Sequence, residues 1–147
     1  MRYQAVVTKQ GRATLAQFPD CPGCHTQADP GEDILELARD ALEGWLEAHL
    51  VLGRVPPLAA TTRRRAPAHA RLVDVPVGPS LAVRILLRVA RHEAGLTQGA
   101  LARKVGVSQQ QIASLESPDA NLTLGTLVKV AAALDHEVEI SLPRATA

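Results

Sequence analysis

The residues with the clearest potential for chemistry are the two cysteines and the histidine of the stretch CPGCH, at positions 21–25. A Cys-x-x-Cys-His spacing is the one at which two thiols attach a haem and the histidine becomes its axial ligand. The same three side chains could belong to a zinc site, or the two thiols could form a redox pair. Pro22-Gly23 between the cysteines is also a turn sequence, so the stretch could simply be a turn that carries two cysteines.

Each of the chemical interpretations lacks one of its requirements. Haem attachment needs export, and the start of the chain, MRYQAVVTKQGRATLA, has no apolar run of secretory length. A zinc site needs about four ligands, whereas Cys21, Cys24 and His25 supply three. A thioredoxin-like pair lies at the start of a helix, and this pair precedes a predicted strand. We therefore expect a structural turn with no metal and no cofactor, and a redox or metal role is the alternative.

The clearest functional pattern is TQGALARKVGVSQQQIASLES, at residues 97–117. It predicts two short helices joined at Gly106, because glycine can adopt the left-handed conformation that a tight turn requires. Thr97 is expected to cap the first helix, and Ser108 with Gln111 to form a capping box at the start of the second. This is the pattern of a helix-turn-helix whose second helix enters the major groove of DNA. The residues expected to face inward are Leu101, Ala102, Val105, Ile112 and Leu115.

The second of these helices leaves amide side chains facing outward, where they could read bases. A glutamine offers a donor and an acceptor in one plane, which matches the N6 and N7 edge of adenine. At the start of the first helix, Gln98 and the free N–H groups of the helix could meet a phosphate. The alternative is a helical hairpin whose glutamines are only a soluble surface. The expected DNA-binding residues are Gln98, Arg103, Ser108, Gln109, Gln110, Gln111 and Ser114.

The residues before this unit predict a small α+β layer in which one helix covers one face of a sheet. Gly11 suits a hairpin turn between the first two strands. Asp29-Pro30 marks the expected beginning of a helix that ends at Gly53 and has one apolar and one acidic face. The expected strands are residues 2–8, 13–18, 25–28 and 71–77.

A stretch without periodicity, PPLAATTRRRAPAHAR at residues 56–71, is expected to be a connecting loop or linker. Its run Arg63-Arg64-Arg65 could be a phosphate-binding arm, although a solvated basic linker is the more ordinary interpretation. Gly78-Pro79 then interrupts the last strand of the layer. We expect the domain boundary there, with one domain at residues 1–78 and a helix-turn-helix domain at residues 79–147.

The carboxy-terminal stretch EVEISL, at residues 137–142, alternates polar and apolar residues and predicts a strand. A single strand behind a helical domain has no sheet to join within its own subunit. Pairing with its copy across a two-fold axis would solve this, and the two half-sites of an operator also require a two-fold axis. The alternatives are a strand docked on the front domain and a frayed tail. The residues expected at this homodimer contact are Val138, Ile140 and Leu142.

The charges of the chain, which has 147 residues and a formal net charge of +1, are unevenly distributed. Residues 1–60 contain five Lys or Arg against eight Asp or Glu, a net charge of −3, whereas residues 61–79 carry +3 and residues 80–147 carry +1. This asymmetry indicates two parts with different partners. No stretch approaches the ~18 apolar residues of a membrane helix, so no membrane partner is expected. Two cysteines without an export signal make the cytoplasm the expected location.

Two stretches of the chain resemble known families. The unit from Leu81 to Leu134 is similar to the DNA-binding domain of lambdoid phage repressors, through the run TQ--LA-KVG--QQ-I--LE. That resemblance implies that Gln98 contacts the DNA backbone and that Gln109 and Gln110 read bases. Residues 3–77 resemble the amino-terminal domain of HicB-family antitoxins, through FPDCPGCHTQAD and the helix that ends in ALEGWLEAHL.

The resemblance to HicB antitoxins implies a partial ribonuclease-H-like domain followed by the helix-turn-helix. It also implies two partners, a small HicA-type toxin that cleaves mRNA and the operator of the antitoxin's own operon. The turn at Asp20, Cys21, Pro22 and Gly23 is the expected toxin contact, and higher oligomers with the toxin are possible.

Two other functions are the alternatives to an antitoxin. A phage-type or metabolic repressor would use the front domain to sense a small molecule. A nuclease is disfavoured, because ribonuclease-H enzymes hold two metal ions with several carboxylates, and the first strand, YQAVVT, has none. We therefore expect a protein that is not an enzyme.

Overall fold

The computed structural model describes residues 1–118 and 121–142, which form two compact units that divide between Ile85 and Leu86. The first unit is a sheet with a helix, and the second unit is helical, so the predicted α+β class is confirmed. The division falls within helix α2 (Pro79–Glu93), which therefore contributes residues to both units. The expected functional boundary near residue 79 lies at the first residue of that helix and stays a prediction. In the described part of the chain, no helix is long and apolar enough to cross a membrane.

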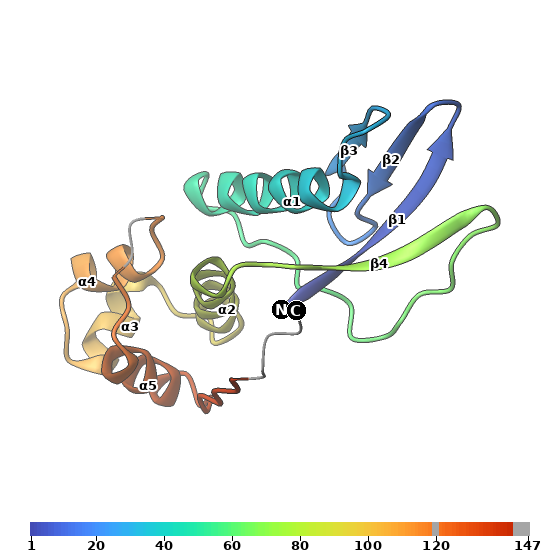
Figure 1. Ribbon diagram of the computed structural model, residues 1–147. Coiled ribbons are helices and arrows are strands. Elements are labelled where there is room, and N and C mark those ends of the chain that lie inside the picture. Colours follow the sequence, from blue (N-terminus) through green and yellow to red (C-terminus); the bar gives the residue numbers. More distant parts are fainter. Residues whose placement is uncertain (119–120, 143–147) are drawn as a thin grey trace. The chain divides into compact units, whose positions relative to one another are not determined.

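The sheet of the first unit has four strands in the order β3-β2-β1-β4, and all neighbouring strands are antiparallel (Figure 1). Gly11 has a φ of +64° in the turn between the first two strands, as the hairpin prediction required. The longest ladder joins the first and last strands, where Tyr3 pairs with Val75. The strands are β1 (Arg2–Gln10), β2 (Ala13–Gln17), β3 (His25–Ala28) and β4 (Ala70–Pro76).

Helix α1 (Ile34–Val51) contacts β2, β3 and β4 and covers one face of this sheet (Figure 1). Alternate residues of β1, namely Tyr3, Ala5 and Val7, are buried because successive side chains of a strand point to opposite faces. The expected helix start at Asp29-Pro30 was wrong. Asp33 caps α1 instead, since its Oδ1 accepts a hydrogen bond of 2.8 Å from the N–H of Leu35. The buried residues of α1 are Ile34, Ala38, Leu42, Leu46 and Leu50.

The long loop between α1 and β4 is anchored to the sheet at several points. The Tyr3 hydroxyl donates to the carbonyl of Pro57 at 2.8 Å. Asp20 accepts a hydrogen bond of 3.1 Å from the N–H of Ala60 and forms an ion pair with Arg64. The N–H of Arg64 also donates to Gln4 Oε1 at 3.0 Å. The predicted connecting loop is therefore attached to β1 and to the turn before β3, rather than acting as a free linker.

The second unit contains the end of α2 and three further helices, α3 (Gln98–Val105), α4 (Gln109–Leu115) and α5 (Leu124–Ala133). Helix α3 contacts both α4 and α5. In α2, Leu87 is buried and its neighbour Leu86 is exposed. The other buried apolar residues of this unit include Leu101, Ile112, Leu115, Val130 and Leu134.

The strand predicted at residues 137–142 is not formed in the single chain. Backbone N–H and C=O groups of a strand need a neighbouring strand, and the described residues of the second unit provide none. Val138 is half-buried, whereas Ile140 and Leu142 are exposed. Pairing of this segment with a second copy of the chain stays a prediction.

Candidate nucleic-acid interface

The helix-turn-helix predicted at residues 97–117 is present with the expected caps and turn. Thr97 Oγ1 accepts a hydrogen bond of 3.1 Å from the N–H of Ala100 at the start of α3. Gly106 ends this helix with a φ of +80°, in the left-handed region that favours glycine. The predicted inward positions Leu101, Ala102, Ile112 and Leu115 are buried, and Val105 is half-buried. The turn therefore places α4 across α3 with its polar side chains outward.

Two of the predicted DNA-binding residues have a structural task at the start of α4. Ser108 Oγ accepts a hydrogen bond of 3.1 Å from the N–H of Gln111, and Gln111 Oε1 accepts one of 2.9 Å from the N–H of Ser108. This is the predicted capping box, which satisfies N–H groups that have no partner within the helix. The Gln111 amide NH₂ group, which has two N–H donors, is not used by these two bonds.

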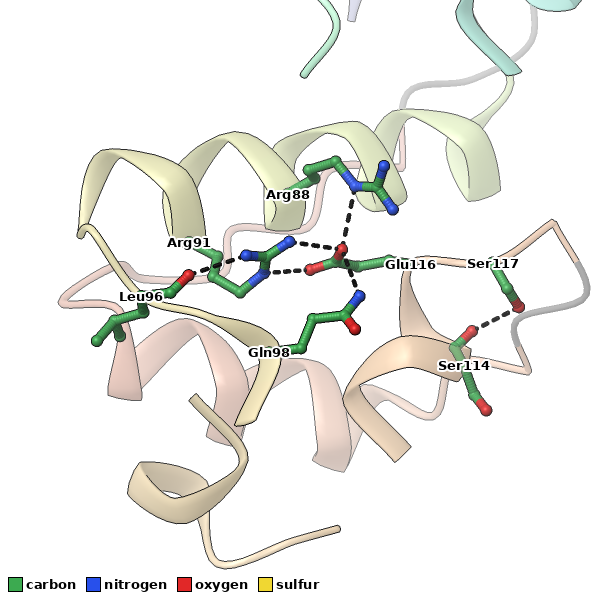
Figure 2. A network of polar contacts seen from close by, with 7 residues as sticks. All are labelled: Arg88, Arg91, Leu96, Gln98, Ser114, Glu116 and Ser117. Carbon is green, nitrogen blue, oxygen red and sulfur yellow. Dashed lines mark hydrogen bonds and ion pairs between the residues drawn. The ribbon is translucent and has the colours of Figure 1, made fainter. Parts of the chain in front are cut away.

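The other predicted reading residues, Gln109, Gln110 and Ser114, are exposed on α4, and Arg103 is exposed on α3. Ser117 Oγ donates to the carbonyl of Ser114 at 2.8 Å, which closes the carboxy-terminal end of α4 (Figure 2). These positions agree with a surface that reads DNA, although contacts with bases stay a prediction.

Removal of the cap gives a direct test of this local geometry. Ser108→Ala is expected to lower the free energy of unfolding by about 1 kcal/mol, because the N–H of Gln111 loses its side-chain acceptor. The matched control is Ser114→Ala, which changes an exposed serine within the same helix and is expected to have little effect. Urea unfolding of the two variants measures the difference. Equal stability of both variants would contradict the capping role.

A buried carboxylate, Glu116, joins α2, α3 and the end of α4 (Figure 2). Its oxygens accept hydrogen bonds from Arg91 Nε at 2.6 Å, Arg91 Nη2 at 2.9 Å and Arg88 Nε at 3.0 Å. The remaining Arg91 Nη1 donates to the carbonyl of Leu96 at 2.9 Å. Because Arg91 donates from Nε and Nη2 to the two oxygens of Glu116, the guanidinium and the carboxylate are held at a fixed distance and orientation. The network therefore holds the chain after α4 against α2.

The charge state of Glu116 follows from these contacts. Burial by itself raises the pKa of this carboxyl, but the hydrogen bond and charge of Arg91, the hydrogen bond from Gln98 and the charge of Arg88 act in the opposite direction. Together they hold the pKa of Glu116 below its ordinary value. Glu116 is thus a permanently charged centre of the network at neutral pH.

Gln98, which was predicted to contact the DNA backbone, belongs to the same network. Its Nε2 donates to Glu116 Oε2 at 3.2 Å, and its side chain is half-buried at the first residue of α3 (Figure 2). The contact fixes the orientation of the amide before any DNA is bound. One N–H of the amide is used by Glu116, and the second N–H is not used by this bond.

The sequence had not indicated Arg88, Arg91 and Glu116 as parts of the site. The only signal was the presence of arginines within the amphipathic helix α2, where Arg88 and Arg91 share one face because they are three residues apart. Glu116, the partner of both arginines, lies 25 residues beyond Arg91, and no rule of local spacing connects Glu116 with Arg91.

The CPGCH stretch forms the predicted turn at Pro22-Gly23. Cys21 and Cys24 are both buried free cysteines, and the N–H of Cys24 donates to the carbonyl of Cys21 at 2.9 Å. Burial raises the pKa of Cys21 to about 12 and that of Cys24 to about 11, so both thiols stay protonated at neutral pH. In residues 1–118 and 121–142, no group of three His, Cys, Asp or Glu side chains is placed to hold a metal ion.

Burial also corrects one part of the expected toxin contact. Cys21 has no exposed surface, so its side chain cannot meet a partner in this conformation. Asp20 is engaged by Arg64 and Ala60. Pro22 and Gly23 are exposed.

Comparison with known proteins decides the family. A model described as Helix-turn-helix matches residues 87–139. Over 128 residues, the chain is 33% identical to Antitoxin HicB 1 of Photorhabdus laumondii, a match that covers 87% of this chain and 77% of that protein. The chain belongs to the HicB family of antitoxins. This HicB chain is also 28% identical to Antitoxin HicB of Escherichia coli strain K12, over 78% of this chain and 80% of that protein.

Among solved structures, the HicA3 and HicB3 toxin-antitoxin complex matches with a TM-score of 0.42 and 22% identity, over 54% of this chain and 100% of the matched chain. Family membership and the helix-turn-helix together identify this HicB chain as a regulatory protein, an antitoxin with a DNA-binding unit.

Proposed function

We propose that this HicB chain neutralises a small HicA-type toxin that cleaves mRNA, and that it represses its own operon through α3 and α4. The single observation that carries the proposal is that one chain combines membership of the HicB family with a helix-turn-helix whose amide side chains are exposed. Both tasks are performed by binding, so the chain needs no catalytic activity and no cofactor. Because the proposed partners are an mRNA-cleaving toxin and the chain's own operon, we expect this function in the cytoplasm.

The charge of α1 supports a role in toxin binding. Five carboxylates before and within the first two turns of α1 are exposed. A toxin that binds RNA must present a positive surface, which such carboxylates would attract. Charges of opposite sign steer two proteins toward each other and select against wrong partners. The exposed Pro22 and Gly23 of the turn before β3 are the second proposed contact. The carboxylates are Asp29, Glu32, Asp33, Glu36 and Asp40.

A homodimer would place two recognition helices on the two half-sites of an operator. The exposed Ile140 and Leu142, together with Val138, are the proposed contact, formed as a strand that pairs with its copy. Such pairing would satisfy the backbone groups of residues 137–142, which have no neighbouring strand in the described part of the second unit. Binding of the toxin to each subunit would build a higher oligomer on this dimer.

Co-expression with the adjacent gene tests the proposal. If the neighbouring gene encodes the toxin, its expression alone is expected to arrest growth, and co-expression of this HicB chain is expected to restore growth. The two proteins are expected to co-purify, and the purified chain is expected to retain the promoter fragment upstream of its own gene in a gel-shift assay. A chain that purifies alone and changes its DNA affinity with a metabolite would instead favour a metabolic repressor.

A further inference from the structure

Gly99, the second residue of α3, lies directly beneath the side chain of a predicted base-reading residue. A Cβ atom at this position would lie 3.2 Å from Gln109 Oε1 and 3.7 Å from Gln109 Cδ. It would also lie 3.8 Å from Arg103 Nη1. Two outward side chains, one from α3 and one from α4, therefore meet over a residue that has no side chain.

The conformation of α3 does not itself require a glycine at this position. Gly99 lies within a regular helix and not in the left-handed region, in contrast to Gly106 at the end of the same helix. Glycine in a helix is less stable than alanine, because it loses more backbone freedom on folding. The space around Gly99 gives a different reason for a glycine there. A Cβ atom at 3.2 Å from Gln109 Oε1 would be closer than an ordinary carbon–oxygen contact, so any side chain would press on the Gln109 amide.

We propose that Gly99 is a specificity-determining residue, because the absence of a Cβ atom there leaves room for the Gln109 amide in the position from which it reads a base. The inference rests on the proposed function, since it assumes that Gln109 contacts a base in the operator. A glutamine recognises a base through a donor and an acceptor in one plane, so a shift of a few tenths of an ångström misaligns both hydrogen bonds. Gly99 thus acts through Gln109 and not through a contact of its own.

The test replaces Gly99 by alanine and measures stability and DNA binding separately. Gly99→Ala is expected to weaken binding to the promoter fragment about tenfold, within the loss that one good base contact carries. Binding to mixed-sequence DNA of the same length is expected to stay unchanged. The melting temperature is expected to stay constant or rise, since alanine favours a helix. A purely structural role for Gly99 would instead lower the melting temperature, and that result would overturn the inference.

The chain offers a closely matched control in Gly125→Ala. Gly125 is also the second residue of a helix, α5, and it also follows a threonine cap two residues earlier. A Cβ atom there would meet nothing within 4 Å. This variant is expected to bind the promoter fragment as the wild type does, with the same small effect of alanine on stability.

A double variant shows whether Gly99 acts through Gln109. In a Gln109→Ala background, the additional change Gly99→Ala is expected to cause no further loss of promoter binding. Wild-type affinity of the single Gly99→Ala variant, or a further loss in the double variant, would overturn the inference and leave the proposed function intact. Failure of the wild type to distinguish its promoter fragment from mixed-sequence DNA would overturn the proposed function, and the inference with it.

Discussion

Replacement of Glu116 by glutamine is expected to lower the free energy of unfolding of the second unit by about 3–5 kcal/mol. The glutamine has a similar shape but removes the negative charge that pairs with Arg91 and Arg88, at distances of 2.6 and 3.0 Å. The side chains of these two arginines are only 8% and 7% exposed, so water cannot replace the lost partner. Because a unit of this size has a small total stability, the variant is expected to be largely unfolded at physiological temperature.

Urea unfolding measures this loss, and Glu93→Gln is its control. Glu93 lies at the last residue of α2, is exposed, and loses the same charge, so its variant is expected to stay within about 0.5 kcal/mol of the wild type. Equal unfolding midpoints for the two variants would show that the network does not stabilise the unit.

The same network predicts a dependence on pH. Because the pKa of Glu116 is lower in the folded chain than in the unfolded chain, its contribution to stability is complete above the unfolded pKa of about 4.3 and is lost as the pH falls through the folded value. The stability difference between wild type and Glu116→Gln is therefore expected to be constant near neutral pH and to shrink in acid. A difference that stays constant down to about pH 3 would contradict the charged state assigned to Glu116.

Replacement of Gln109 and Gln110 by alanine is expected to abolish specific binding to the promoter fragment. Both residues are exposed on α4, and each base contact of a glutamine is worth about 1–3 kcal/mol of discrimination. Two lost contacts correspond to a loss of at least about 30-fold in affinity, and the variant is expected to bind the promoter fragment no better than mixed-sequence DNA. The gel-shift assay with both DNA fragments measures this loss.

The same double variant is expected to rescue growth in the presence of the toxin as well as the wild type does. The first unit, which carries the proposed toxin contacts, does not contain the two changed residues. Gln10→Ala with Gln17→Ala is the matched control, since it makes two identical changes at exposed positions of β1 and β2 and is expected to retain promoter binding. Parallel loss of promoter binding and of growth rescue by the α4 variant would refute the separation of the two tasks.

The parts of the fold that the sequence predicted correctly depend on short-range rules. The cap at Ser108 with Gln111 and the left-handed turn at Gly106 each involve residues within a few positions of each other. The apolar positions of α3 and α4 follow the helical period, and both could be assigned from the pattern alone. The outward position of Gln109 and Gln110 follows from the same period.

The parts that could not be predicted depend on contacts between distant residues. Glu116 meets Arg91 and Arg88 from another helix, and Asp20 meets Arg64 across 44 positions. Charged residues of these types are usually solvated, so their sequence positions favoured a surface location. The packing of Gln109 over Gly99 is a tertiary contact of the same kind.

The error in the start of α1 had a local origin. Asp29-Pro30 looked like a helix start, but Asp33 offers a second capping side chain nearer to the apolar stripe, and Gly31 has a φ of +100° before it. The alternating stretch at residues 137–142 forms no strand in the single chain, because alternation does not supply the neighbouring strand that its backbone groups need, and its pairing with a second copy stays a prediction.

The anchored loop between α1 and β4 has a consequence for proteolysis. Arg63, Arg64 and Arg65 are exposed there, and a trypsin-like protease cleaves after arginine in segments of this kind. The cut would divide the chain into an amino-terminal fragment that ends in the loop and a carboxy-terminal fragment that begins just before β4. The seven residue pairs between β1 and β4 would still join the two fragments. A nicked molecule would thus keep the amino-terminal fragment and the helix-turn-helix together until the strands of the sheet separated.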